Sequence, residues 1–70
     1  MLYVLKIKGT TTIPDFVQIR DENLTLRAYF RLSQVEKGLK KNNLGKESEG
    51  ITLLLKKIPF GKIHIYNTNE

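Results

Sequence analysis

Between residues 23 and 33 the sequence reads NLTLRAYFRLS and alternates between apolar and polar side chains with almost no error. A period of two residues is typical of a strand with one buried face, because successive side chains of a strand point to opposite sides of the sheet. The set expected to face a core is Leu24, Leu26, Ala28, Phe30 and Leu32. The set expected to face outward is Thr25, Arg27, Tyr29 and Arg31. The chain is therefore expected to contain a strand whose outer side carries arginine and tyrosine.

Three other segments show the same period, and each predicts a further strand. In segment 2–8 the residues expected inside are Tyr3, Leu5 and Ile7, and those expected outside are Val4, Lys6 and Lys8. In segment 16–20 Val17 and Ile19 are expected inside, with Gln18 and Arg20 outside. In segment 62–66 Ile63 and Ile65 are expected inside, with Lys62, His64 and Tyr66 outside. The polar turn 21–23 is expected to join the second and third strands in a hairpin.

After Ser33 the period changes to that of a helix. The sequence S-Q-V-E predicts a capping box, in which the side chains of Ser33 and Glu36 bond each other's backbone amide groups. Val35 and Leu39 continue at helical spacing, and the following N-N-L-G sequence offers residues for a left-handed helix cap. A short helix is therefore expected over about residues 33–42.

A second helix is predicted before Pro59, where a helix has to end. Ile51, Leu54, Leu55 and Ile58 follow one another at i, i+3, i+4 and i+7, which is the apolar stripe of an amphipathic helix. A buried strand over 51–55 is the alternative, because a short apolar run fits either structure.

The expected order of elements is β-β-β-α-α-β, which defines a small two-layer α+β domain over residues 1–66, with a flexible tail at 67–70. The pairing partner of the last strand stays open. The predicted core consists of Leu5, Ile7, Val17, Ile19, Leu26, Ala28, Phe30, Leu32, Val35, Leu39, Leu54, Leu55, Ile58, Ile63 and Ile65. A chain of 70 residues without cysteine buries little surface and has no disulfide, so a homodimer is a reasonable expectation.

The side chains that carry catalysis are scarce in this sequence. It has one histidine, His64, no cysteine, and serines only at positions 33 and 48. The seven carboxylates fall in predicted turns, links, the tail or a helix cap, so no converging acid pair is expected. We therefore expect a non-enzymatic protein with no catalytic residue, no metal and no cofactor.

The charge pattern points instead to binding. Twelve lysines and arginines against seven acids give a net charge of +5, which favours an anionic partner. The candidate binding residues on the outward sheet face are Lys6, Lys8, Arg20, Arg27, Tyr29, Arg31, Lys62, His64 and Tyr66. Nucleic-acid bases stack on aromatic rings while arginine and lysine neutralise phosphates, so this mixture predicts binding of single-stranded nucleic acid.

Other interpretations of the same residues remain. The face is merely solvated or covered in a dimer, since acids are depleted from strands in general, or it docks an accessory subunit onto a larger acidic protein. Lys37, Lys40 and Lys41 form a second basic candidate, and Lys37 and Lys41 share one helix face because they are four residues apart. No apolar run approaches the roughly 20 residues of a spanning helix, and the cytoplasm is the expected location.

Overall fold

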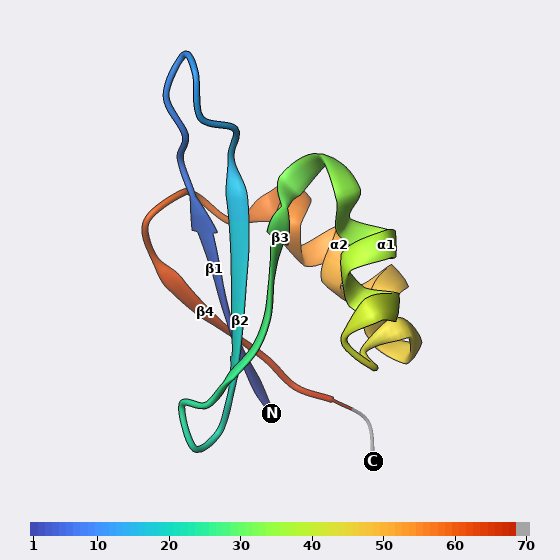
Figure 1. Cartoon of the computed structure of the whole chain (residues 1–70). Coiled ribbons are helices and arrows are strands. Elements are labelled where there is room, and N and C mark those ends of the chain that lie inside the picture. The colour runs from blue at the N-terminus through green and yellow to red at the C-terminus, as the bar shows by residue number, and fades with distance from the viewer. Residues whose placement is uncertain (69–70) are drawn as a thin grey trace.

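The computed structural model describes residues 1–68 and shows a four-stranded sheet with two helices packed on one of its faces (Figure 1). The strands are β1 (Leu2–Ile7), β2 (Phe16–Asp21), β3 (Leu26–Arg31) and β4 (Ile63–Tyr66). The helices are α1 (Val35–Lys41) and α2 (Ser48–Lys57), each preceded by a single 3-10 turn, Leu32–Gln34 and Gly45–Glu47 respectively. The predicted α+β class and the order β-β-β-α-α-β are confirmed.

The sheet is antiparallel throughout, with the strand order β3-β2-β1-β4. The chain makes two hairpins, leaves the sheet through both helices, and returns along the free side of β1. This return answers the question of where the last strand pairs. β3 and β4 are thus the two edge strands, and the helices cover one face while the other face stays open.

The core lies between the sheet and the helices. Its buried apolar residues are Leu2, Val4, Val17, Ile19, Ala28, Phe30, Leu39, Leu44, Ile51, Leu55 and Ile58. For β2 and for Ala28 and Phe30 of β3, the predicted inward residues are confirmed. Leu26 was expected in the core, but it is 49% exposed.

The predicted orientation of β1 and β4 is wrong. Leu2 and Val4 are buried in the core, whereas Leu5 and Ile7 lie on the open face. Both sides of β1 are apolar, so alternation alone does not fix which side faces inward. The error carries over to β4, because Val4 is paired with His64 and Leu5 with Ile63. Ile63 and Ile65, predicted inside, are 64% and 55% exposed.

The helix ends agree with the sequence only in part. No side chain caps the first turn of α1, and Ser33 lies inside the 3-10 turn that precedes it, so the predicted capping box does not form. At the other end Asn43 has a φ of 60°, which confirms the left-handed cap, and the Asn42 side chain donates to the carbonyl of Gly38 at 2.7 Å. Residues 51–55 are helical, which excludes the alternative strand.

The β2–β3 hairpin is organised by Asp21. Its Oδ1 accepts the amide of Asn23 at 2.9 Å and that of Thr25 at 3.0 Å. Leu24, with a φ of 63°, takes the left-handed turn position, and the pairing register shifts between Ile19 and Arg20. This β-bulge breaks the alternation of β3 near Leu26, which is why the sequence pattern misplaces that part of the strand.

The described chain ends at Thr68, whose hydroxyl lies 3.3 Å from the N-terminal ammonium group of Met1. The predicted flexible tail therefore falls partly, at 69–70, outside the described residues. Across residues 1–68, no helix is both long enough and apolar enough to cross a bilayer.

Gly38 is required where α1 meets β3. A Cβ atom at this position would lie 2.6 Å from Cδ2 of the Phe30 ring, whereas one at Gly45 would find its nearest neighbour, Lys40 Cγ, at 3.4 Å. We expect Gly38→Ala to lower the free energy of unfolding. Overpacking costs about 1–3 kcal/mol and outweighs the gain in helix propensity of about 1 kcal/mol. Urea denaturation of Gly38→Ala and of the control Gly45→Ala checks this. Equal stability of the two variants would contradict the close packing.

Candidate functional site

The structure separates the nine predicted binding residues instead of gathering them on one face. Tyr29 and Arg31 lie on the open face, where they pair with Gln18 and Phe16 of β2. Arg20 lies on the same face, opposite Leu26, and its guanidinium donates to the carbonyl of Leu24 at 2.9 Å. Of the nine, these three belong to the open sheet face.

Lys6 was expected to point outward, and this expectation is wrong. It is only 8% exposed and lies on the helix-covered face of β1. Its ammonium group donates to the carbonyl oxygens of Leu55 at 2.9 Å and Ile58 at 3.1 Å, at the C-terminal end of α2. The side chain satisfies helix-end carbonyls that have no intrahelical partner, and the positive charge suits the negative end of the helix dipole. Lys6 is therefore a structural residue.

Lys8 and Lys62 are exposed, but they lie at the end of β1 and the start of β4. The ammonium group of Lys8 is 4.9 Å from the centre of the Phe60 ring, and that of Lys6 is 4.4 Å from the same centre. The backbone amide of Gly61 donates to the carbonyl of Lys6 at 2.8 Å and fixes this segment beside β1. Lys8 thus lies beside a loop aromatic and does not extend the row of Tyr29 and Arg31.

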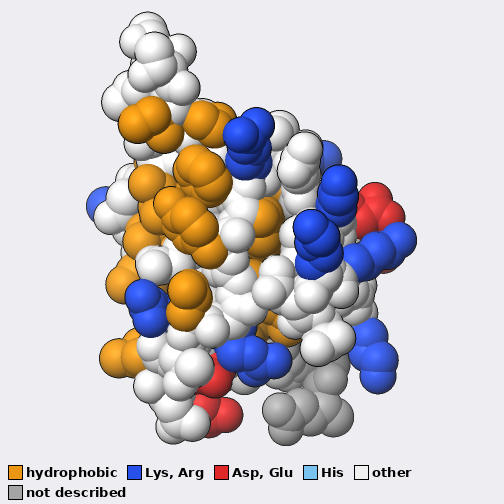
Figure 2. Space-filling view, in the orientation of Figure 1, with side chains coloured by type: hydrophobic (Ala, Val, Ile, Leu, Met, Phe, Trp, Pro, Cys, Tyr) orange, Lys and Arg blue, Asp and Glu red, His pale blue; other side chains and the backbone are white. Residues whose placement is uncertain are grey.

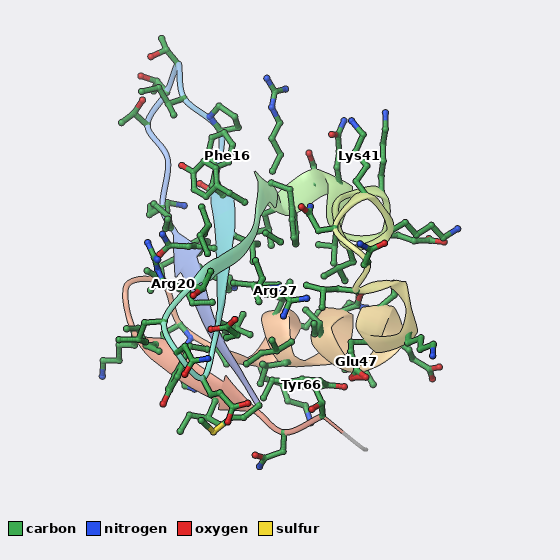
Figure 3. The ribbon with its side chains drawn as sticks, turned by 60° about the horizontal axis from the view of Figure 1, so that its bottom comes forward. Phe16, Arg20, Arg27, Lys41, Glu47 and Tyr66 are labelled. Atoms are coloured by element: carbon green, nitrogen blue, oxygen red, sulfur yellow. The ribbon has the colours of Figure 1, made fainter. Side chains whose placement is uncertain are left out.

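His64 and Tyr66 are turned toward the helices, contrary to the prediction. The Tyr66 hydroxyl lies against Gly50 of α2, where no side chain blocks its approach. Partial burial raises the pKa of Tyr66, and the negative charge of Glu47 and the hydrogen bond to its carboxylate raise it further. Figure 3 shows Tyr66 and Glu47 close together. Among residues 1–68 the buried Nε2 of His64 has no hydrogen-bond partner.

Arg27 lies at the β-bulge, and Figure 3 shows it extending toward the helices rather than alongside Arg20. Its Nη1 is 4.0 Å from Oδ2 of Asp21, the residue that organises the hairpin turn. The prediction that Arg27 shares one face with Tyr29 and Arg31 is therefore wrong.

A groove lies between the edge strand β3 and helix α1. Its lining residues were not expected from the sequence to lie close together. We call it the β3–α1 groove; its volume is about 270 Å³. Its lining residues are Phe16, Tyr29, Phe30, Arg31, Gln34, Lys37, Gly38, Lys41 and Asn42. Three of them carry a positive charge and, among the described residues that line it, none is acidic. The groove is therefore a cationic site next to aromatic rings.

The aromatic part of the groove is a stacked pair of rings. The rings of Phe16 and Tyr29 are stacked with their centres 4.8 Å apart and an angle of 1° between their planes. Tyr29 is still 52% exposed, so it can offer contact area to a ligand. A stacked pair of this kind is worth about 0.5–1.5 kcal/mol beyond the area that it buries, so Phe16 stabilises the orientation of the Tyr29 ring.

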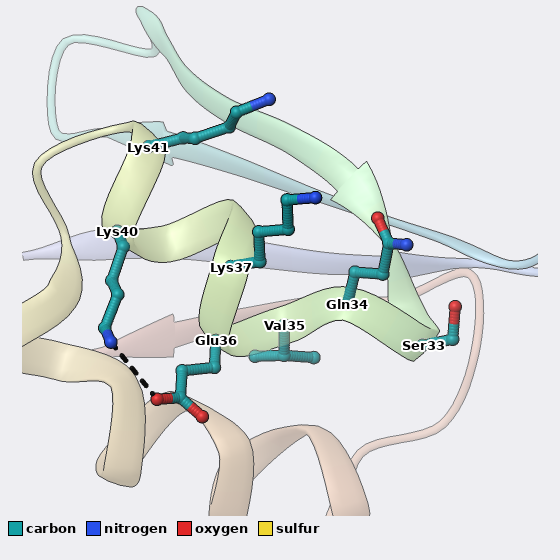
Figure 4. A pocket seen from close by; sticks show the side chains of 7 residues that line it. All are labelled: Ser33, Gln34, Val35, Glu36, Lys37, Lys40 and Lys41. Atoms are coloured by element: carbon teal, nitrogen blue, oxygen red, sulfur yellow. Dashed lines mark ion pairs between the residues drawn. The ribbon is translucent and has the colours of Figure 1, made fainter.

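The cationic part comes from one side of α1. Figure 4 shows Lys37 and Lys41 extending on the β3 side of the helix, whereas Lys40 reaches the opposite side. There the ammonium group of Lys40 lies 3.4 Å from the Glu36 carboxylate. Lys37 and Lys41 also line an adjoining hollow of about 570 Å³, and the pair of Lys40 and the acidic Glu36 forms part of its wall. The spacing of four residues already indicated that these two lysines share a face, but not that this face borders Tyr29 and Arg31.

Comparison with protein-family models, with curated proteins and with solved structures found no match. Within residues 1–68, no three histidine or acidic side chains come together in a way that could hold a metal ion.

The two hydrogen bonds of Lys6 to the end of α2 predict that this side chain stabilises the fold. We expect Lys6→Met, which keeps most of the buried stem, to lower the free energy of unfolding by about 1.5–3 kcal/mol because two carbonyls lose a charged donor. The same substitution at Lys40, which is exposed and paired with Glu36, is expected to cost no more than about 0.5 kcal/mol. Chemical denaturation compares the two variants, and a Lys6→Met protein as stable as Lys40→Met would argue against the capping role.

Tyr66 predicts a dependence of stability on alkaline pH. Because its folded pKa is raised above the ordinary value of 10.0, the unfolded chain loses this proton first. The contribution to stability is fully present below about pH 10 and is lost as the pH rises through the folded pKa. We expect the difference in unfolding free energy between the wild type and Tyr66→Phe to shrink over this range. Urea denaturation between pH 8 and pH 11 measures it; a constant difference would exclude the effect.

Proposed function

We propose that this protein is a small non-enzymatic binding module that holds single-stranded nucleic acid in the β3–α1 groove. The observation that carries the proposal is the position of Arg31, Lys37 and Lys41 around the exposed ring of Tyr29. Bases stack on such rings whatever their sequence, while neighbouring cations neutralise the phosphates that connect them. Sequence-independent binding of single strands needs this combination.

Each group in the groove has a distinct task in the proposed complex. Tyr29, braced by Phe16, receives a base on its exposed surface. Arg31 contacts a phosphate with its planar guanidinium group, which forms paired hydrogen bonds better than lysine does. Lys37 and Lys41 lie one helical turn apart and provide point charges for adjacent phosphates. The strand is therefore expected to follow the β3 edge of the sheet.

This proposal replaces the nine binding residues expected from the sequence with a smaller set around the β3–α1 groove. Tyr29 is still proposed to stack on a base and Arg31 to contact a phosphate. Lys6, His64 and Tyr66 are no longer proposed as binding residues, because they face the helices. The competing interpretation is an accessory subunit that docks onto an acidic protein, and the experiment below separates the two. A cytoplasmic location remains part of the proposal, since a chain without cysteine is compatible with a reducing compartment.

The direct test is fluorescence anisotropy of a labelled mixed-sequence single strand, titrated with the protein at several salt concentrations. Three neutralised phosphates give a slope of log K against log salt of about −2, which means a loss of affinity of roughly 20-fold between 50 and 200 mM salt. We expect this slope to fall to about −0.7 in the double variant Arg31→Glu/Lys41→Glu, in which one of the three cationic contacts is left. The double variant Lys56→Glu/Lys57→Glu, in the last turn of α2 and outside the groove, serves as the charge-matched control.

Stacking is tested separately with Tyr29. We expect Tyr29→Ala to weaken binding by about 5- to 150-fold, the equivalent of about 1–3 kcal/mol, and Tyr29→Phe to retain most of the affinity. Circular dichroism confirms that each variant is folded. The nucleic-acid proposal fails if the groove variants bind as well as the Lys56→Glu/Lys57→Glu control, or if the wild type shows no binding at low salt. The second result would favour an acidic protein partner.

A further inference from the structure

The open face of the sheet divides into two halves of different chemistry. The half formed by β2 and β3 carries Arg20 and Arg31. The half formed by β1 and β4 carries only uncharged side chains, which we call the apolar patch: Tyr3, Leu5, Ile7, Ile63 and Ile65. An antiparallel sheet with one solvated face normally turns polar residues toward that face, whereas β1 and β4 turn apolar residues toward it.

The apolar patch is continuous across the two strands. Tyr3 is directly paired with Ile65, and Leu5 with Ile63, so their side chains are neighbours on the same face. Ile63 and Ile65 are the most exposed members, at 64% and 55%. Figure 2 shows hydrophobic side chains gathered over the sheet while lysine and arginine predominate over the helices. A contiguous exposed patch of this type marks an interaction site.

We propose that the apolar patch is the interface through which two copies of this chain associate face to face. A two-fold axis along the strands, between β1 and β4, lays β1 of one copy over β4 of the other. The same five residues then meet on both sides, as a symmetric interface requires. β2 and β3 of the two copies extend to opposite outer edges.

The distribution of charge favours a second copy over other occupants. The usual spacings of strands and of packed sheets place the two β2 strands of this dimer about 14 Å apart parallel to the sheets and about 10 Å apart perpendicular to them. Arg20 and Arg31 are then farther from their symmetry mates than the screening length of about 8 Å at physiological salt. The cation beside the patch is Arg20, which pairs with Tyr3 but donates to the carbonyl of Leu24, so an acidic partner finds no cation within the patch. Nucleic-acid bases find four aliphatic side chains and one tyrosine. A second copy presents matching apolar surface.

The size of the patch sets the expected strength. Five side chains on two short strands form an interface below about 1,200 Å² in total, which is the range of weak and transient association. We therefore expect half-association at protein concentrations of about 10–500 µM. The proposal does not depend on ligand binding, since the β3–α1 groove lies at the opposite edge of the sheet.

Analytical ultracentrifugation of the free protein from 5 µM to 1 mM tests the interface. We expect the wild type to shift from monomer to dimer, and the double variant Ile63→Lys/Ile65→Lys to remain monomeric at 1 mM. Leu53→Lys is the matched control, because Leu53 is equally exposed, at 53%, but lies on α2. This control is expected to associate like the wild type.

A second measurement uses the wild type alone and does not depend on the folding of a variant. Concentration-dependent changes in NMR amide shifts are expected in β1 and β4 and not in α1 or α2. A wild type that stays monomeric at 1 mM overturns the proposal. So does a dimer that survives the double substitution, a dimer broken equally by Leu53→Lys, or shift changes confined to the helices.

Discussion

The contact between Lys6 and the end of α2 determines how the sheet presents its two faces. Its ammonium group bonds the carbonyls of Leu55 and Ile58, which places the even-numbered residues of β1 toward the helices. A lysine in this position covers apolar surface with its stem and brings a charge to an otherwise unsatisfied helix end. Because β4 pairs with β1, the same choice orients His64 and Tyr66 inward and the two isoleucines outward.

This orientation separates two kinds of surface that a simple alternation would have mixed. Had Lys6, His64 and Tyr66 faced outward, the open face would have been basic and aromatic from edge to edge. Instead, the β1–β4 half is apolar, and the exposed positive charge near aromatic rings is concentrated where β3 meets α1. Gly38 is essential to this second surface, since only a residue without a side chain lets α1 approach Phe30 so closely.

The sequence predicts the elements better than their orientation. Strands β2 and β3 carry a clear contrast between their two sides, so Val17, Ile19, Ala28 and Phe30 were placed correctly. β1 has apolar residues on both sides. Its one charged residue, Lys6, points toward the helices, whereas its charge suggested that it would point toward solvent. Arg27 was misplaced because a β-bulge shifts the register, and a bulge depends on the pairing of two strands rather than on one segment. The groove was not predicted. The helical spacing indicated only that Lys37 and Lys41 share a helix face, and their proximity to Tyr29 is a tertiary feature.

The strand order also relates the two proposed surfaces. With the two-fold axis between β1 and β4, the edge strands β3 of the two copies lie about 24 Å apart sideways, and each carries its own groove on the outer side. A single strand of nucleic acid long enough to reach both grooves would bind the second one at a high effective concentration. By thermodynamic reciprocity, such a ligand strengthens the dimer by the same factor by which dimerisation strengthens its binding. The weak interface and the shallow groove would then support one another, because the apolar patch and the cationic edge lie at opposite sides of one sheet.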